Sequence, residues 1–112
     1  MSELAALRCV MSETGLPKVT DDALRQLMAE VPGWRLNDKK DAIARTYSFR
    51  NYYETLAFVN AVAWIAHGEN HHPDLTVHYD SCVVRWNTHA VGGLTENDFI
   101  CAAKVSALLP DG

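Results

Sequence analysis

The sequence predicts an α+β domain in which three helices pack on one face of a four-stranded antiparallel sheet, in the order α-β-β-α-β-β-α. Three segments carry apolar residues at helical spacing, and the two segments between them alternate apolar and polar residues around a polar turn. With 112 residues the chain can build one core. We therefore expect a single domain over residues 20–112, preceded by a loosely ordered lead-in over residues 1–19.

The first predicted elements are a helix and a hairpin. The helix is expected to begin after a cap at Thr20 and to end at Pro32 and Gly33, because its apolar positions follow the pattern i, i+3, i+4, i+7: Leu24, Leu27, Met28 and Val31. The hairpin is expected over residues 34–49, with a polar turn at residues 37–41 between period-two positions that include Trp34, Leu36, Ile43, Tyr47 and Phe49.

A long helix is predicted next. Asn51 can cap it, with Glu54 three residues further on, and Pro73 must stop it. One continuous apolar stripe is expected to face the core: Tyr52, Leu56, Val59, Ala63 and Ala66.

The second hairpin is predicted to turn at residues 80–81. This turn would pair apolar or aromatic residues on one face, namely Tyr79 with Cys82, Val77 with Val84, and Leu75 with Trp86. The opposite face would carry His78, Val83, Thr76 and Arg85, and also His89 if the strand stays regular. That face could meet ligand or solvent.

The last helix is predicted from a cap formed by Thr95 and Asp98 through Leu109. Its apolar residues lie on more than one face, which predicts contact with the sheet and with a second subunit. The three tryptophans, Trp34, Trp64 and Trp86, are expected in the core because large aromatic residues at such spacing usually pack.

Composition excludes several classes of function. The formal charge is −4 with no run of Lys or Arg, so we expect no nucleic-acid partner. The longest apolar stretch, residues 56–66, is far shorter than the roughly 20 residues of a membrane span, and the N-terminus does not resemble a secretory signal. Three widely spaced cysteines suit reduced thiols, which predicts a cytoplasmic protein.

The histidines are the strongest candidates for chemistry. Four of the five lie within residues 67–78, and His89 follows the second predicted hairpin. If the long helix reaches residue 70 or 71, His67 and His71 share one face, and His72 and His89 could converge on the same pocket.

Three interpretations of this cluster stay open. The histidines could be surface residues favoured by the helix dipole. They could form a zinc site with three ligands, although adjacent His71 and His72 cannot easily both reach one ion. They could also perform acid/base catalysis without a metal, since imidazole, with a pKa near 6.5, can take and give a proton at neutral pH.

One ordered series of residues resembles the signature of the pterin-4a-carbinolamine dehydratase family: His67, three residues, His71, His72, Pro73, five residues, Tyr79, nine residues, His89, eight residues, Asp98. The resemblance covers about residues 20–109 and includes the Pro32, Gly33, Trp34 entry. The family often has Glu where this chain has His67, so a carboxylate there is replaced by an imidazole.

The resemblance implies a hydro-lyase that dehydrates 4a-hydroxytetrahydropterin to quinonoid dihydropterin and so recycles the pterin of aromatic amino acid hydroxylases. His71, His72 and His89 would be catalytic, with His71 and His89 as the main proton carriers. His67 and Tyr79 would contact substrate. Apart from the resemblance, Arg85 is a further candidate substrate contact because it shares the predicted polar face of the second hairpin, with a solvated strand-edge charge as the alternative. Asp98 is expected to act mainly as a helix cap.

The resemblance also implies the partners of the chain. Pterin would be the substrate, and neither an organic cofactor nor a metal would be needed. The chain would form a homodimer or homotetramer and could bind a hydroxylase. Two alternative functions remain: a dimerisation cofactor for a homeodomain transcription factor, and a zinc-dependent enzyme.

Overall fold

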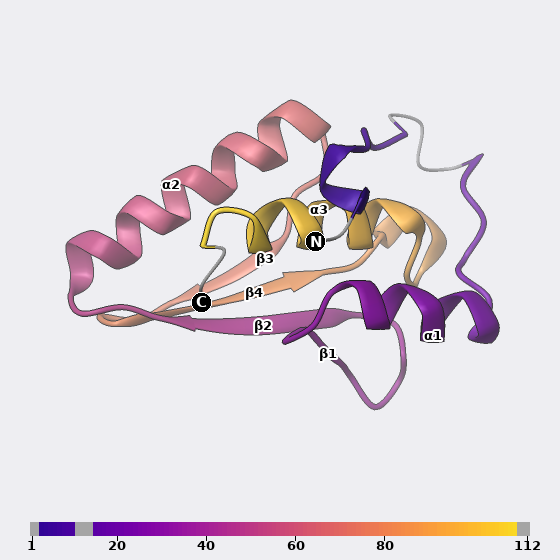
Figure 1. The fold of residues 1–112 in the computed structure, drawn as a ribbon, viewed down its shortest axis with the longest axis horizontal. Helices are drawn as coiled ribbons and strands as arrows, with labels where there is room; N and C mark the ends of the chain where they lie inside the picture. The colour runs from indigo at the N-terminus through magenta and orange to yellow at the C-terminus, as the bar shows by residue number, and fades with distance from the viewer. Residues whose placement is uncertain (1–2, 11–14, 110–112) are drawn as a thin grey trace.

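A computed structural model describes residues 3–10 and 15–109 and confirms the α+β prediction. The sheet is antiparallel with strand order β1-β2-β4-β3. Figure 1 shows α2 and α3 along one face of it, and α1 packs against α3. The elements are η1 (Glu3–Ala6), α1 (Asp21–Glu30), β1 (Arg35–Leu36), β2 (Ile43–Ser48), α2 (Tyr52–Glu69), β3 (Asp74–Val77), β4 (Ser81–Trp86), η3 (His89–Val91) and α3 (Glu96–Ser106).

The first helix and hairpin form where the sequence predicts them. The Thr20 hydroxyl accepts a hydrogen bond from the Ala23 N–H at 3.2 Å, which satisfies one of the free donors at the start of α1. Gly33 has a φ of 89°, in the left-handed region, and a Cβ there would come within 2.9 Å of the Arg45 guanidinium. The connection into β1 therefore requires glycine.

Helix α2 begins as predicted but buries a different stripe. The Asn51 side chain accepts from the Glu54 N–H at 2.9 Å, whereas the Glu54 carboxylate accepts from Arg50 rather than from the cap residue. The buried stripe of α2 contains Thr55, Phe58 and Val62, one residue away from the expected stripe, so Tyr52 and Ala63 are exposed, and Glu69 is buried at the end of the helix. The prediction that Trp64 lies in the core is wrong, since it is 75% exposed, while Trp34 and Trp86 are buried.

The predicted turn of the second hairpin is also wrong. The hairpin closes through the His78 N–H, which donates to the Ser81 carbonyl at 2.8 Å, so Val77 lies opposite Cys82 and Leu75 opposite Val84. The register is shifted by two residues. Because side chains alternate with period two, this shift leaves each residue on its predicted face. Cys82, Val84 and Trp86 are buried accordingly.

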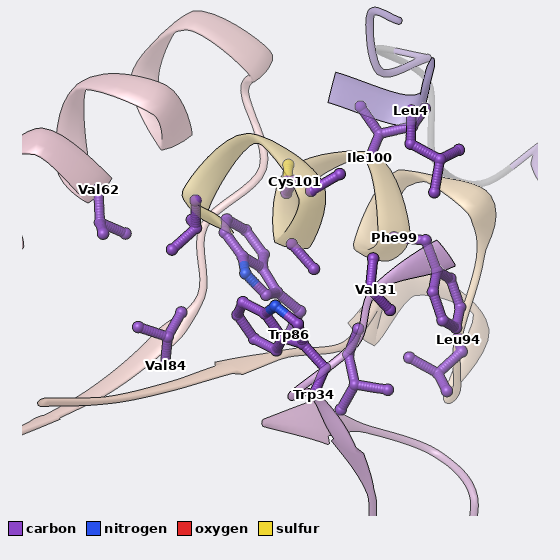
Figure 2. Packing of buried hydrophobic residues seen from close by; sticks show 14 of the residues in the cluster. Leu4, Val31, Trp34, Val62, Val84, Trp86, Leu94, Phe99, Ile100 and Cys101 are labelled. Atoms are coloured by element: carbon purple, nitrogen blue, oxygen red, sulfur yellow. The ribbon is translucent and has the colours of Figure 1, made fainter. Parts of the chain in front are cut away.

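Helix α3 ends at Ser106, three residues before the predicted end, and is buried on several sides within one chain. One side faces the sheet, and η1 covers another, so a second subunit is not needed to explain its apolar faces. In Figure 2, Leu4 reaches the same core cluster as Phe99 and Ile100.

The N-terminal region differs from the predicted lead-in. Residues 3–10 are packed on the domain rather than loosely ordered, because Leu4 and Cys9 are buried in the core cluster. Residues 1–2 and 11–14 of the predicted lead-in, and residues 110–112 of the predicted domain, lie outside the described residues. Within the described part, no helix combines the length and the apolar character that crossing a bilayer requires.

Candidate active site

The candidate site is organised by one buried carboxylate, that of Asp98. Its Oδ1 accepts from the ring of His71 at 2.7 Å, and its Oδ2 accepts from the Thr88 hydroxyl at 2.8 Å and from the Thr95 N–H at 2.9 Å. Asp98 is fully buried, so these hydrogen bonds replace the water it loses. The predicted helix cap is confirmed, but the same side chain also binds two segments that lead to the other histidines.

His71 lies just beyond the end of α2 instead of within it. Asn70 takes a left-handed conformation with φ of 52° and ends the helix, and the His71 N–H donates to the Ala66 carbonyl at 3.1 Å. The His71 ring is 5% exposed and stacks on Trp86 with centroids 5.3 Å apart. Because the carboxylate can only accept, Nε2 of His71 carries the hydrogen of their bond.

His72 and His89 meet at the surface beside this buried pair. Their ring centroids are 6.2 Å apart with an interplanar angle of 28°. Both are exposed, and each is the sequence neighbour of a residue bound to Asp98, since His72 follows His71 and His89 follows Thr88. The carboxylate therefore binds the side chain of a sequence neighbour of each histidine in the pair.

His89 reaches this place by a route that simple alternation does not give. Strand β4 ends at Trp86, and His89 begins the short helix η3, so the prediction that His89 continues the strand is wrong. Thr88 pairs with Gly93 through an isolated bridge, and Gly92 closes η3 with a φ of 66°. This tight turn brings the His89 ring back over the loop that carries His72.

Of the three candidate substrate contacts, His67, Tyr79 and Arg85, only Arg85 lies toward the histidine pair. Arg85 lies at the same end of the β3–β4 hairpin and donates to Asp74 at 3.2 Å, as expected of a half-exposed strand charge. His67 is exposed and packs on Trp64, with centroids 5.6 Å apart, so it does not share a face with His71.

Tyr79 lies at the other end of the hairpin. It is 65% exposed in the β3–β4 turn and stacks on Tyr52, with ring centroids 6.4 Å apart. The strand β4 (Ser81–Trp86) separates this turn from His89, which at about 3.3 Å per residue is a long distance for a side-chain contact. Within one chain, Tyr79 is therefore not part of the histidine cluster.

Both rings of the histidine pair are exposed. Surface hollows elsewhere include one of about 460 Å³ beside Trp64, Glu69 and Lys104, and one of about 210 Å³ beside Lys18 and Gly93. Within residues 3–10 and 15–109, no three His, Cys, Asp or Glu side chains are grouped so that they could hold a metal ion. The donor set for the zinc alternative is thus not assembled there.

Sequence reasoning missed two residues that build the site. Thr88 binds the second oxygen of Asp98, and Trp86 provides the surface on which the His71 ring stacks. For Thr88 the sequence held a signal, since its hydroxyl stands next to His89 and seven residues before the capping residue Thr95. In the structure the Thr88 and Thr95 hydroxyls are hydrogen-bonded at 2.8 Å. No local pattern links Trp86 to His71, because they come from different elements.

Comparison with known proteins gives a consistent result. Residues 17–108 match the family model described as Pterin 4 alpha carbinolamine dehydratase. A pterin-4-alpha-carbinolamine dehydratase of Stenotrophomonas maltophilia (strain R551-3) is 59% identical over 105 residues, which cover 94% of this chain and 90% of the relative. One of Xanthomonas campestris pv. campestris (strain 8004) is 55% identical over 109 residues, covering 97% and 92%.

A solved structure is also similar. The transcriptional coactivator/pterin dehydratase from Brucella melitensis matches with a TM-score of 0.78 at 27% identity, covering 82% of this chain and 98% of the other. The similarity supports the observed arrangement of three helices and a four-stranded sheet.

Proposed function

The chain belongs to the pterin 4 alpha carbinolamine dehydratase family, and we propose that it removes water from 4a-hydroxytetrahydropterin by histidine acid/base catalysis. The observation that carries this proposal is the meeting of the exposed His72 and His89 rings, 6.2 Å apart, beside the buried His71–Asp98 pair. Its relatives are named as dehydratases, which are hydro-lyases, in agreement with the class predicted from the sequence.

The reaction needs one proton delivered and one removed. The hydroxyl on C4a leaves as water after it accepts a proton, and N5 loses its proton as the C4a=N5 double bond of the quinonoid dihydropterin forms. Acid and base act on neighbouring atoms of one flat ring. Two imidazoles side by side, one protonated and one neutral, can supply both functions and exchange roles after each turnover.

We assign the proton transfers to His72 and His89 and give His71 a supporting role. This differs from the pair expected from the sequence, His71 and His89. The reason is that the His71 ring is almost fully buried and its Nε2–H is committed to Asp98, whereas the other two rings are exposed.

The two rings would meet a flat substrate with their edges. Their centroids are 6.2 Å apart, which is less than the spacing of about 7 Å, or two van der Waals contacts of about 3.5 Å, that a heterocycle between their faces would need. An imidazole gives and takes protons at nitrogens in the plane of its own ring, so proton transfer requires the nitrogen-bearing edges to face N5 and the C4a hydroxyl. We propose that Arg85, at the same end of the hairpin, contacts the edge of the pterin, while His67 and Tyr79 would contribute only through another arrangement or a second subunit.

The wider role follows from the family resemblance. We propose that the reaction recycles the pterin of an aromatic amino acid hydroxylase in the cytoplasm, and that the chain works as a homo-oligomer with no organic cofactor. The free, buried state of Cys9, Cys82 and Cys101 is compatible with a reducing compartment.

The test is a direct rate measurement. The decay of 4a-hydroxytetrahydropterin, released by a hydroxylase, is followed by absorbance with and without the purified chain. We expect decay to accelerate in proportion to the concentration of the chain. A decay rate equal to that of the uncatalysed reaction at all concentrations would reject the proposal.

A second candidate function is a protein-binding module. It is favoured by one observation, that the similar Brucella melitensis structure is called a transcriptional coactivator as well as a pterin dehydratase. The two functions are separated by replacing His72 and His89 together with alanine. Loss of dehydration with retained partner binding would show that both exist on one fold.

A further inference from the structure

Residues 8–10 connect the end of α2, two residues before His71, with α3, which carries Asp98. These residues precede the region, 17–108, that matches the family model. They follow η1, which lies over α3 in Figure 1. We call residues 8–10 the N-terminal strap and follow its contacts first to α2 and then to α3.

On the α2 side, the strap binds Glu69, the last residue of the helix and two residues before His71. The Cys9 N–H donates to Glu69 Oε1 at 2.7 Å, and Arg8 Nε lies 2.9 Å from Glu69 Oε2. Arg8 also donates to the Gly68 carbonyl at 3.0 Å. Glu69 is 6% exposed, so these donors satisfy a carboxylate that has lost most of its water.

The charge state of Glu69 agrees with this role. Burial alone raises the pKa of its carboxyl, but the hydrogen bond from the Cys9 N–H and the positive charges of Lys104 and Arg8 outweigh burial. The pKa of Glu69 therefore lies below its ordinary value, and the carboxylate is ionised at neutral pH.

On the α3 side, the strap binds Asn97, the residue before Asp98. The Asn97 side chain accepts from the Val10 N–H at 3.0 Å and donates to the Val10 carbonyl at 2.9 Å, so it pairs with the strap as a second strand would. The Cys9 thiol lies 3.7 Å from the Asn97 carbonyl and 3.5 Å from the thiol of Cys101. Asn97 is 1% exposed, whereas Val10 is exposed, so the contact is partly buried.

We infer that the N-terminal strap is a positioning element that sets the distance between His71 and Asp98, with Glu69 and Asn97 as its two positioning residues. One end of the strap is tied beside His71 and the other beside Asp98. Beside the strap, the two elements are joined at this point by the His71–Asp98 hydrogen bond, by the ion pair in which Lys104 Nζ lies 3.8 Å from Glu69 Oε2, and by apolar packing. A hydrogen-bonded bridge next to each partner limits how far the His71–Asp98 bond can open.

The role of the strap in catalysis rests on the proposed function, but its effect on His71 does not. If the strap loosens, Asp98 also holds Thr88 less firmly relative to His71, and the His72 and His89 rings lose their alignment. Misplacement of reacting groups lowers kcat more than it raises KM, since substrate contacts remain while geometry is lost.

The test compares Glu69→Ala and Asn97→Ala with the conservative Glu69→Gln. The glutamine keeps an oxygen that can accept from the Cys9 N–H. Asn60→Ala, at an exposed position of α2, serves as the matched control. Two readouts are used on folded protein: the ¹H resonance and solvent exchange of the His71 Nε2–H proton by NMR, and kcat and KM for dehydration.

We expect both alanine variants to speed exchange of the Nε2–H proton and to lower kcat roughly 10-fold with KM nearly unchanged. Glu69→Gln should restore most of both signals, and Asn60→Ala should match the wild type. If Glu69→Ala does not fold, Arg8→Met takes its place, because the Arg8 side chain is 71% exposed and its loss is tolerable, with a smaller change in the same direction.

Folded variants whose Nε2–H signal and exchange rate equal those of the wild type would overturn the inference. The NMR readout holds even if the wild type shows no dehydration. Failure of the proposed function and failure of the positioning role are therefore distinguished.

Discussion

Replacing Asp98 with asparagine should leave the fold intact. It should reverse the direction of the hydrogen bond with His71, so that residue 98 becomes the donor. The amide keeps one acceptor oxygen and has the shape of the carboxylate. Its oxygen is best placed toward the Thr88 hydroxyl and the Thr95 N–H, because these two donors share Oδ2 in the wild type. The amide NH₂ then faces Nε2 of His71, and two donors cannot form a hydrogen bond. His71 must move its proton to the other ring nitrogen or turn its ring away.

The magnitudes distinguish this effect from simple destabilisation. Asp98→Ala leaves three buried donors without an acceptor, at about 1–3 kcal/mol each, and we expect a loss of about 3–5 kcal/mol after local relaxation. Asp98→Asn keeps two of the three bonds, so the loss should be about 1–2 kcal/mol. Asp38→Asn, in the exposed turn after β1, is the matched control and should cost nothing measurable.

Two assays test this expectation. Urea denaturation gives the free energies of unfolding, and ¹⁵N NMR of the imidazole rings reports which nitrogen of His71 is protonated. In Asp98→Asn we expect the Nε2–H signal to disappear and kcat for dehydration to fall by about 10²-fold, as for a displacement of about 1 Å. A variant that keeps Nε2 protonated and retains wild-type kcat would refute the role given to Asp98.

Three further predictions concern the rest of the fold. The difference in unfolding free energy between wild type and Glu69→Gln should be constant at neutral pH and shrink as pH falls below about 4. The reason is that the lowered pKa of Glu69 gives stability that is lost when the carboxylate is protonated. Thermal melts at stepped pH values measure this difference, and an unchanged difference at low pH would contradict the prediction. Burial raises the pKa of Cys82, and a neighbouring thiol together with burial raises the pKa of Cys101. Both thiols should therefore resist alkylation in the native state and react after unfolding, as mass spectrometry of modified peptides would show. Rapid labelling of the native protein would disprove this prediction. Trp86→Ala should cost about 3–5 kcal/mol of unfolding free energy, whereas Trp64→Ala at an exposed position should cost below about 1 kcal/mol, and equal losses in urea titrations would contradict the observed burial.

Local signals in the sequence predicted the element order correctly. The caps at Thr20, Asn51 and Thr95 involve residues three positions apart, so short-range spacing is enough to find them. The faces of the second hairpin were also correct, because alternation depends only on neighbouring residues.

The register of that hairpin could not be predicted in the same way. Registers that differ by two residues bury the same faces, so the apolar pattern does not distinguish them. The choice is made by β2, which pairs Ser48 with Ser81 while the Phe49 N–H donates to the Asp80 carbonyl at 2.8 Å. These contacts join segments far apart in the sequence.

The position of His71 had a local signal that the helical pattern obscured. Asparagine is, after glycine, a common residue for a left-handed helix end, and Asn70 ends α2 there. With this signal the helix is expected to end before His71, so His67 and His71 are no longer expected on one helical face. The packing of residues 3–10 on the domain had no such local signal. The residues that this segment contacts lie about 60 to 99 positions away in the sequence, as for Cys9 with Glu69 and Ala5 with Lys104.

The proposed catalytic pair is tested most directly by the dehydration rate of His89→Ala, measured beside His78→Ala, which removes an exposed histidine at the far end of the hairpin. Loss of an acid/base group typically lowers the rate by about 10²–10⁴-fold, and we expect a loss of this size for His89→Ala with an unchanged fold by circular dichroism. His78→Ala should keep the wild-type rate. A His89→Ala protein that dehydrates the carbinolamine as fast as the wild type would contradict the proposed mechanism.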